Sequence, residues 1–147
     1  MRSILVDIDH TISAAWDRDP MIGVESWDEY HNASKSDQPI QHMANLVNDL
    51  AWAGYNIIGM TARPEKWRQL TLDWLIKHGI VMHELLMRPD DAFHPAPEIK
   101  VNLAKQRFGD DLPIMVAFIM DDREDVILAF QELGVPGMIV HGRRMVV

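Results

Sequence analysis

The chain has no cysteine, which excludes disulfide bridges and thiolate metal sites. It has no run of 18 apolar residues and no cluster of Lys or Arg that would form a basic stripe. We therefore expect no membrane-spanning helix, no signal peptide and no extended nucleic-acid groove. The cytoplasm is the simplest location for such a chain, or the host cytoplasm if the chain comes from a phage. The net charge of −8 still allows a small nucleotide or a single strand end as a ligand.

The 147 residues fit a single domain, 1–147, along which predicted strands and helices alternate. We expect strands at residues 4–6, 55–60, 84–87, 114–120 and 138–141, and helices near 39–54, 64–78, 98–108 and 124–133. This alternation predicts an α/β fold, a doubly wound, Rossmann-like parallel sheet with helices on both faces. Residues 12–38 interrupt the pattern, and we interpret them as a small cap or lid insertion. Asp37 is the expected start of the helix that follows this insertion.

The segment Asp7-Ile8-Asp9-His10-Thr11, which follows the first strand, is the most informative part of the chain. Side chains two residues apart on a strand point the same way, so Asp7 and Asp9 should face one spot. Ligands of open α/β sheets bind at the carboxyl ends of the strands. Two carboxylates at this edge repel each other unless a hard divalent cation, which also binds phosphate, lies between them. The segment therefore predicts a metal-assisted phosphate site.

Three later segments bring further polar groups to the same edge of the predicted sheet. Thr61 follows the second strand, Lys100 follows the loop 88–97, and Asp121-Asp122 ends the fourth strand. Each group alone has a simple structural alternative: Thr61 can cap a helix, Lys100 can lie in solvent, and acids favour a helix start. Because all of them are expected at strand ends or beside them, together they predict one site.

These segments, in this order and over nearly the whole chain, resemble the four motifs of the haloacid dehalogenase (HAD) superfamily of phosphohydrolases. The local sequence is similar to the phosphatase half of phage polynucleotide kinases and to 5′(3′)-deoxyribonucleotidases. The segments that carry this similarity are Thr61-Ala62-Arg63-Pro64-Glu65, Trp74-Leu75, Met87-Arg88-Pro89 and Asp121-Asp122-Arg123. His10 departs from the family pattern, because Gly is usual at that position. Its imidazole could lie near the leaving group or simply pack under the lid.

The resemblance implies a role for each of four candidate catalytic residues. Asp7 would attack phosphorus and form an aspartyl-phosphate, which divides one difficult displacement into two steps. Asp9 would protonate the leaving oxygen and then activate water for the second step. Thr61 and Lys100 would hold the nonbridging phosphate oxygens, over which charge is spread in the transition state.

The resemblance also implies Mg²⁺ as the cofactor. Its expected ligands are the Asp7 carboxylate, the Asp9 backbone carbonyl and one member of the Asp121-Asp122 pair. The sequence does not decide which of Asp121 and Asp122 touches the metal.

The candidate substrate-binding residues are His10, Thr11, Trp27, Tyr30 and Arg63. The lid side chains Trp16, Trp27, Tyr30 and His31 could stack a nucleobase, or at least two of them could pack the lid onto the core. Arg63 is expected to brace the carboxylates more than to touch the substrate.

We therefore expect a Mg²⁺-dependent phosphomonoester hydrolase that acts on a small nucleotide-type substrate. Free (deoxy)nucleoside monophosphates come first, because the chain is acidic, and a 3′-phosphorylated nucleic-acid end is the alternative. A receiver-like signalling module is a distant second class, since it uses similar residues around Mg²⁺. In receivers the acid pair comes first along the chain, whereas here it comes last. No membrane partner is expected, and the oligomeric state is left open.

Overall fold

The structure is a computed structural model that describes residues 1–143. Within these residues one parallel sheet has the strand order β3-β2-β1-β4-β5, which confirms the predicted doubly wound α/β fold. The strands are β1 (Ser3–Val6), β2 (Asn56–Pro64), β3 (Glu84–Arg88), β4 (Val116–Asp121) and β5 (Gly137–Ile139). None of the helices in this part of the chain has the length and apolar character needed to cross a bilayer.

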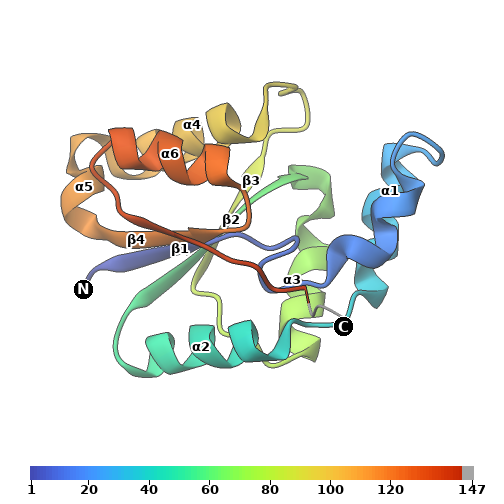
Figure 1. The fold of residues 1–147 in the computed structure, drawn as a ribbon, viewed down its shortest axis with the longest axis horizontal. Helices are drawn as coiled ribbons and strands as arrows, with labels where there is room; N and C mark the ends of the chain where they lie inside the picture. The colour runs from blue at the N-terminus through green and yellow to red at the C-terminus, as the bar shows by residue number, and fades with distance from the viewer. Residues whose placement is uncertain (144–147) are drawn as a thin grey trace.

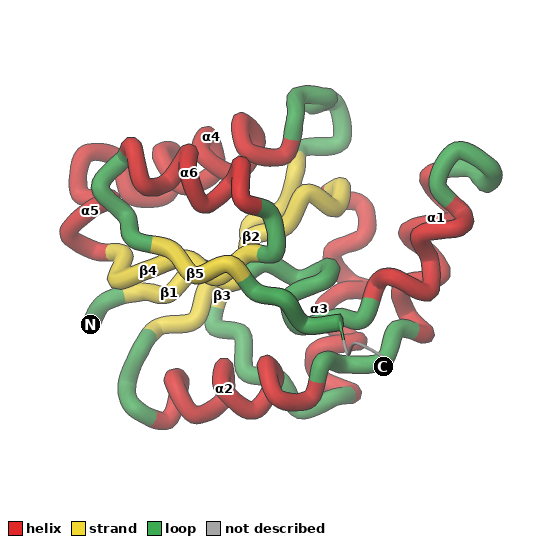
Figure 2. Tube along the Cα trace, in the orientation of Figure 1, coloured by secondary structure: helices red, strands yellow, loops and turns green. Residues whose placement is uncertain are grey.

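Helices cover both faces of the sheet, so the molecule has three layers (Figures 1 and 2). One face carries α2 (Gln41–Trp52) and α3 (Arg68–Lys77). The other face carries α4 (Ala96–Phe108), the short α5 (Leu112–Met115) and α6 (Glu124–Glu132). Each face buries its own apolar cluster against the sheet, which is the arrangement that a parallel sheet requires.

The central strand β1 is buried on both faces. Ile4 and Val6 belong to the cluster on the α2–α3 face, and Leu5 belongs to the cluster on the α4–α6 face. This alternation explains why the strand is an unbroken apolar run. Val6 pairs with Met120 of β4, and the Asp7 amide donates to the Met120 carbonyl at 3.0 Å. The strand register therefore brings Asp7 to the middle of the carboxyl edge, beside the end of β4.

Residues 12–38 form three short helical segments beyond the carboxyl edge of the sheet. These are the 3-10 helix η1 (Ala15–Met21), the helix α1 (Trp27–Asn32) and the 3-10 helix η2 (Ala33–Ser36). The Ser26 hydroxyl accepts from the Glu29 amide at 3.1 Å and caps α1. Figure 1 shows α1 projecting from the three layers.

The structure corrects three expected boundaries. Asp37 does not start the helix after the insertion: α2 begins at Gln41, and the buried Asp37 side chain is held by ion pairs. The strand expected from residue 114 begins at Val116, because Pro113 at the start of α5 favours a helical turn there. The strand β2 continues past residue 60 to Pro64, so Thr61 and Arg63 lie on the strand itself.

The core on the α4–α6 face gives a stability prediction. Phe130 of α6 is fully buried, whereas Leu128 of the same helix is 50% exposed. Phe130→Ala should lower the free energy of unfolding by about 3–5 kcal/mol, because the cavity it leaves loses both transfer and packing energy. Leu128→Ala, the matched control, should change it by less than about 1 kcal/mol. Urea unfolding of both variants measures this, and equal losses would contradict the assignment of the core.

Candidate active site

Asp7, Lys100 and Asp121 form the buried floor of the candidate site. The Lys100 ammonium donates to Asp7 Oδ1 at 2.7 Å and to Asp121 Oδ2 at 2.5 Å. The other Asp7 oxygen accepts from the Thr11 hydroxyl at 2.9 Å. The second Asp121 oxygen accepts from the Arg123 amide at 2.9 Å, at the start of α6. The residues predicted from β1, α4 and β4 therefore meet at one point, with the two oxygens of each aspartate in fixed positions.

The floor carries three carboxylates against one ammonium. Asp7, Asp121 and Asp122 each offer an oxygen, and these oxygens lie within 4.8 Å of one another. Burial and the Asp7 carboxylate raise the pKa of Asp122 to about 8. Burial and Asp7 also raise the pKa of Asp121, to about 6, although Lys100 opposes this shift. Three acidic groups this close to one another disfavour a third negative charge, and together they form an all-oxygen donor set, so they fit a hard divalent cation such as Mg²⁺.

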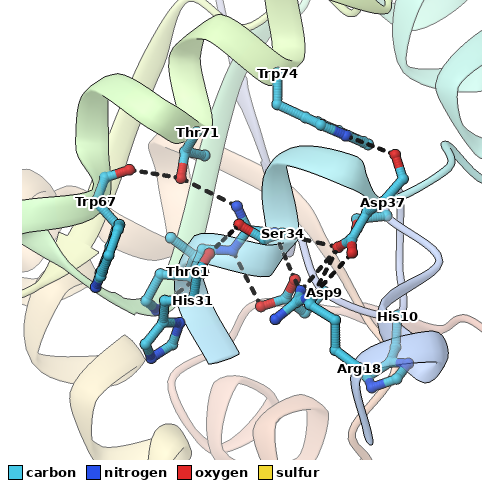
Figure 3. A network of polar contacts seen from close by, with 12 residues as sticks. Asp9, His10, Arg18, His31, Ser34, Asp37, Thr61, Trp67, Thr71 and Trp74 are labelled. Carbon is cyan, nitrogen blue, oxygen red and sulfur yellow. Dashed lines mark hydrogen bonds and ion pairs between the residues drawn. The ribbon is translucent and has the colours of Figure 1, made fainter. Parts of the chain in front are cut away.

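Asp9 lines the same pocket as this floor and is held by two buried arginines. Figure 3 shows one of them, Arg18, beside Asp9. Arg63 donates to both Asp9 oxygens, at 3.1 and 2.6 Å, and Arg18 donates to Oδ1 at 2.7 Å. Burial alone would raise the pKa of Asp9, but the two guanidinium groups outweigh it and hold that pKa well below its usual range. The Asp9 carboxylate is therefore ionised and fixed in orientation, and Arg63 braces a carboxylate as expected.

The insertion is anchored to the site through the same ion pairs. Arg18 of η1 donates to both oxygens of Asp37, with contacts at 2.9 Å from Nε and 2.8 Å from Nη2. Ser13 donates to Asp37 Oδ2 at 2.5 Å, and the Trp74 indole of α3 donates to the Asp37 carbonyl at 2.9 Å. Neither Arg18 nor Asp37 lies at a predicted strand end, so the sequence pattern does not identify them as site residues.

Thr61 is buried at the end of β2, where its hydroxyl accepts from the Arg63 amide at 3.1 Å. It lines the same pocket as Asp7 and Lys100, so the structure brings it to the predicted edge. Thr61 does not cap the following helix, since no side chain caps η3 (Glu65–Trp67) or α3. The position fits a hydroxyl that is available to a bound ligand.

A pocket of about 680 Å³ opens above the carboxylates. Trp27 of α1 and Phe93 of the loop after β3 both line it, and they are 62% and 85% exposed. Exposed aromatic side chains from two separate segments thus face one cavity, which suits a flat ligand. Tyr30 also lines the pocket but is buried, with the Arg18 guanidinium 4.6 Å above its ring. Phe93 lies in a loop without periodicity, so the sequence pattern does not identify it as a pocket residue.

His10 adopts the left-handed backbone conformation, with φ of 66°. Only glycine adopts this conformation freely, which accounts for the usual Gly at this position of the motif. The imidazole Nε2 lies 3.2 Å from Asp19 Oδ1, and the ring stacks on Trp16 with centroids 6.2 Å apart. Both partners belong to the insertion, so the His10 side chain packs against the insertion at the mouth of the pocket.

Comparisons with known proteins give a consistent family. The family model for the polynucleotide kinase PNKP phosphatase domain, a HAD model, matches residues 1–142. A Bacillus cereus protein provisionally named a nucleotidase is 31% identical over 93 residues, which are 60% of this chain and 46% of that protein. A chain of the Pnkp1/Rnl/Hen1 RNA repair complex is 24% identical with a TM-score of 0.79, over 95% of this chain and 42% of that chain.

A HAD-family enzyme from Bacteroides thetaiotaomicron, solved with magnesium and inorganic phosphate, shares the fold. It is 13% identical with a TM-score of 0.58, and the match covers 95% of this chain and 93% of that one. The chain therefore spans less than half the length of the nucleotidase relative and the RNA repair chain, but nearly all of this enzyme.

The parallel sheet, with carboxylates, a lysine and a threonine at its carboxyl edge, defines a HAD-type phosphohydrolase domain. Within this superfamily, the chain belongs to the PNKP phosphatase-domain family. The resemblance inferred from the sequence motifs is confirmed.

The buried ion pairs give a second stability prediction. Asp37→Asn should lower the free energy of unfolding by about 3–5 kcal/mol, because it leaves the buried Arg18 and Arg63 with one neighbouring carboxylate instead of two. The matched control is Asp125→Asn, whose pair with Arg123 is half exposed and should contribute less than about 1 kcal/mol. Urea unfolding at neutral pH compares them. A loss of less than 1 kcal/mol for Asp37→Asn would show that Asp9 alone compensates the two arginines.

Proposed function

We propose that the chain is a Mg²⁺-dependent phosphomonoester hydrolase whose substrate is a nucleotide. The observation that carries this proposal is the pocket itself. Its floor holds Asp7 and Lys100, and its walls hold the exposed Trp27 and Phe93. A phosphate group on the floor and a flat base between the walls would occupy both parts at once.

In the first step Asp7 attacks phosphorus, the bond to the leaving oxygen breaks, and an aspartyl-phosphate forms. Lys100, which contacts the nucleophile at 2.7 Å, holds a nonbridging oxygen together with the Thr61 hydroxyl. Asp9 gives a proton to the leaving oxygen. Because Arg63 and Arg18 favour its ionised form, the negative phosphate must first shift Asp9 toward the protonated form, as a like charge does.

In the second step water attacks the aspartyl-phosphate, and Asp9 takes the proton of that water as a general base. The two arginines suit this step, since they keep the carboxylate ionised and pointed at one place. Inorganic phosphate leaves and Asp7 is restored. Both steps therefore use one carboxylate whose position is set by the insertion and by β2.

The carboxylates of Asp7, Asp121 and Asp122, with the Asp9 backbone carbonyl, would hold Mg²⁺. When bound, the ion supplies charge that draws the phosphate dianion toward the aspartates and offsets charge in the transition state.

Free (deoxy)nucleoside monophosphates are the first candidate substrates, because one nucleotide has the size and chemistry of the pocket and the chain as a whole is acidic. A 3′-phosphorylated nucleic-acid end is the second candidate. The match to the PNKP phosphatase-domain model favours it, and so do Lys66, Arg88 and Arg123, which line the pocket.

The direct test is phosphate release from 5′- and 3′-mononucleotides and from a 3′-phosphorylated oligonucleotide, with Mg²⁺ and with EDTA. We expect release only with Mg²⁺ and a higher kcat/KM for a mononucleotide than for phenyl phosphate, because the aromatic walls bind the base. Release from the oligonucleotide alone would establish the second candidate. Undiminished release in EDTA would contradict the metal assignment.

Replacement of the nucleophile tests the mechanism. Asp7→Asn should reduce kcat by at least about 10³-fold, or about 4 kcal/mol in the activation barrier, because an amide cannot form the aspartyl-phosphate. The control is Asp110→Asn, an exposed residue of η4 (Gly109–Asp111) before β4, which should retain wild-type kcat. Urea unfolding confirms that both variants fold. Wild-type phosphate release by Asp7→Asn would contradict the mechanism.

A further inference from the structure

His31 of α1 is a buried histidine in the wall of the pocket. It is 8% exposed, and it lines the cavity that also holds Asp7 and Lys100. Its ring stacks on the exposed Trp27, with centroids 6.1 Å apart and planes 29° apart. The Trp67 ring also lies near it, with centroids 6.1 Å apart, and Figure 3 shows the two side chains next to each other. His31 therefore lies directly beside the aromatic surface that would bind a base.

Two nitrogens in this aromatic group are buried without a hydrogen-bond partner among residues 1–143: Nδ1 of His31 and Nε1 of Trp67. Buried polar atoms are nearly always paired, because an unpaired one costs about 1–3 kcal/mol. Burial lowers the pKa of His31 to about 4, so its ring is neutral at pH 7 and has one donor and one acceptor nitrogen.

The two unpartnered atoms are chemically complementary. The indole N–H of Trp67 can only donate, and a neutral His31 can accept at Nδ1. A hydrogen bond from the Trp67 indole to His31 Nδ1 would place the imidazole proton on Nε2. His31 would then offer an N–H donor to an acceptor in the pocket that the ring lines.

We propose that His31 is a specificity-determining residue that reads the edge of a nucleobase bound in this pocket. This inference rests on the proposed nucleotide substrate and deepens it. Trp27 and His31 lie on one helix and line the same pocket as the exposed Phe93, so a base held by the aromatic walls can present its edge to the imidazole. The acceptor atoms of base edges differ between bases, so one fixed donor discriminates among them.

His78 has surroundings similar to those of His31, but it lies outside the pocket. It also has a buried nitrogen without a partner, Nε2, and it packs on an aromatic ring, that of Trp74, at 4.8 Å. It lies at the carboxyl end of α3, and it does not line the pocket. His78 is thus a control for the loss of a half-buried, ring-packed imidazole whose Nε2 is buried without a partner.

The test compares His31→Phe with His78→Phe on 5′-mononucleotides of all four bases and on phenyl phosphate, which has no base. Phenylalanine keeps the planar ring and removes both nitrogens. We expect His31→Phe to raise KM for the preferred nucleotide about 10-fold, the effect of one hydrogen bond, and to level the base preference. Its kcat/KM on phenyl phosphate should fall much less than its kcat/KM on the preferred nucleotide, and His78→Phe should match the wild type on every substrate.

A second variant, His31→Gln, keeps a donor and an acceptor and should retain part of the base preference, even if the ring at this position matters for folding. If His31→Phe leaves KM and the base preference unchanged, the role of His31 is overturned, while the proposed nucleotide substrate stands. Equal losses on phenyl phosphate and on nucleotides would overturn it too, since His31 would then act at the phosphate. A wild-type protein that hydrolyses phenyl phosphate but no nucleotide would overturn the proposed substrate and this inference together.

Discussion

The candidate site depends on two buried arginines that share two aspartates. Arg18 and Arg63 both contact Asp9, and Arg18 also binds Asp37 through both of its oxygens. Guanidinium groups removed from water are costly unless every charge is paired, so this arrangement tolerates little displacement of its members. It joins the end of β1, the insertion and the end of β2. The same ion pairs therefore fix both the orientation of the Asp9 carboxylate and the position of the insertion.

These ion pairs also position the insertion over the pocket. Trp27 and His31 lie on α1, and the buried Tyr30 of that helix contacts Arg18. An ion pair of 2.6 Å between Asp28 and Lys66 adds a link to η3 at the rim. That exposed pair contributes little on its own, whereas the buried pairs are strong enough to fix the helix. The proposed base-binding wall is therefore held by the same charges that orient the proposed general acid.

The residues that the sequence could identify are those whose position follows from the strand pattern. Asp7, Thr61 and Asp121 lie at the ends of apolar runs, so a parallel sheet brings them together whatever the loops do. Arg18 and Phe93 lie in segments without periodicity, and Arg18 pairs with Asp9 and Asp37, which are distant in the chain. A long-range ion pair or an aromatic pocket wall produces no local pattern in the amino-acid sequence. The lid was recognisable as an interruption, but its contacts were not predictable.

Net charge is a poor guide to the substrate here, because binding depends on the charge near the pocket. The overall charge of −8 favours a small nucleotide over a nucleic acid, whereas Lys66, Arg88 and Arg123 line the pocket itself. Screening limits the reach of distant acids to about 8–10 Å, so a ligand in the pocket responds mainly to the charges that line it. Those charges include acids as well, because Asp28 and Asp90 line the pocket and Lys66 is paired with Asp28 at 2.6 Å. The acidity of the whole surface is therefore weaker support for a mononucleotide than the fit of one nucleotide to the pocket.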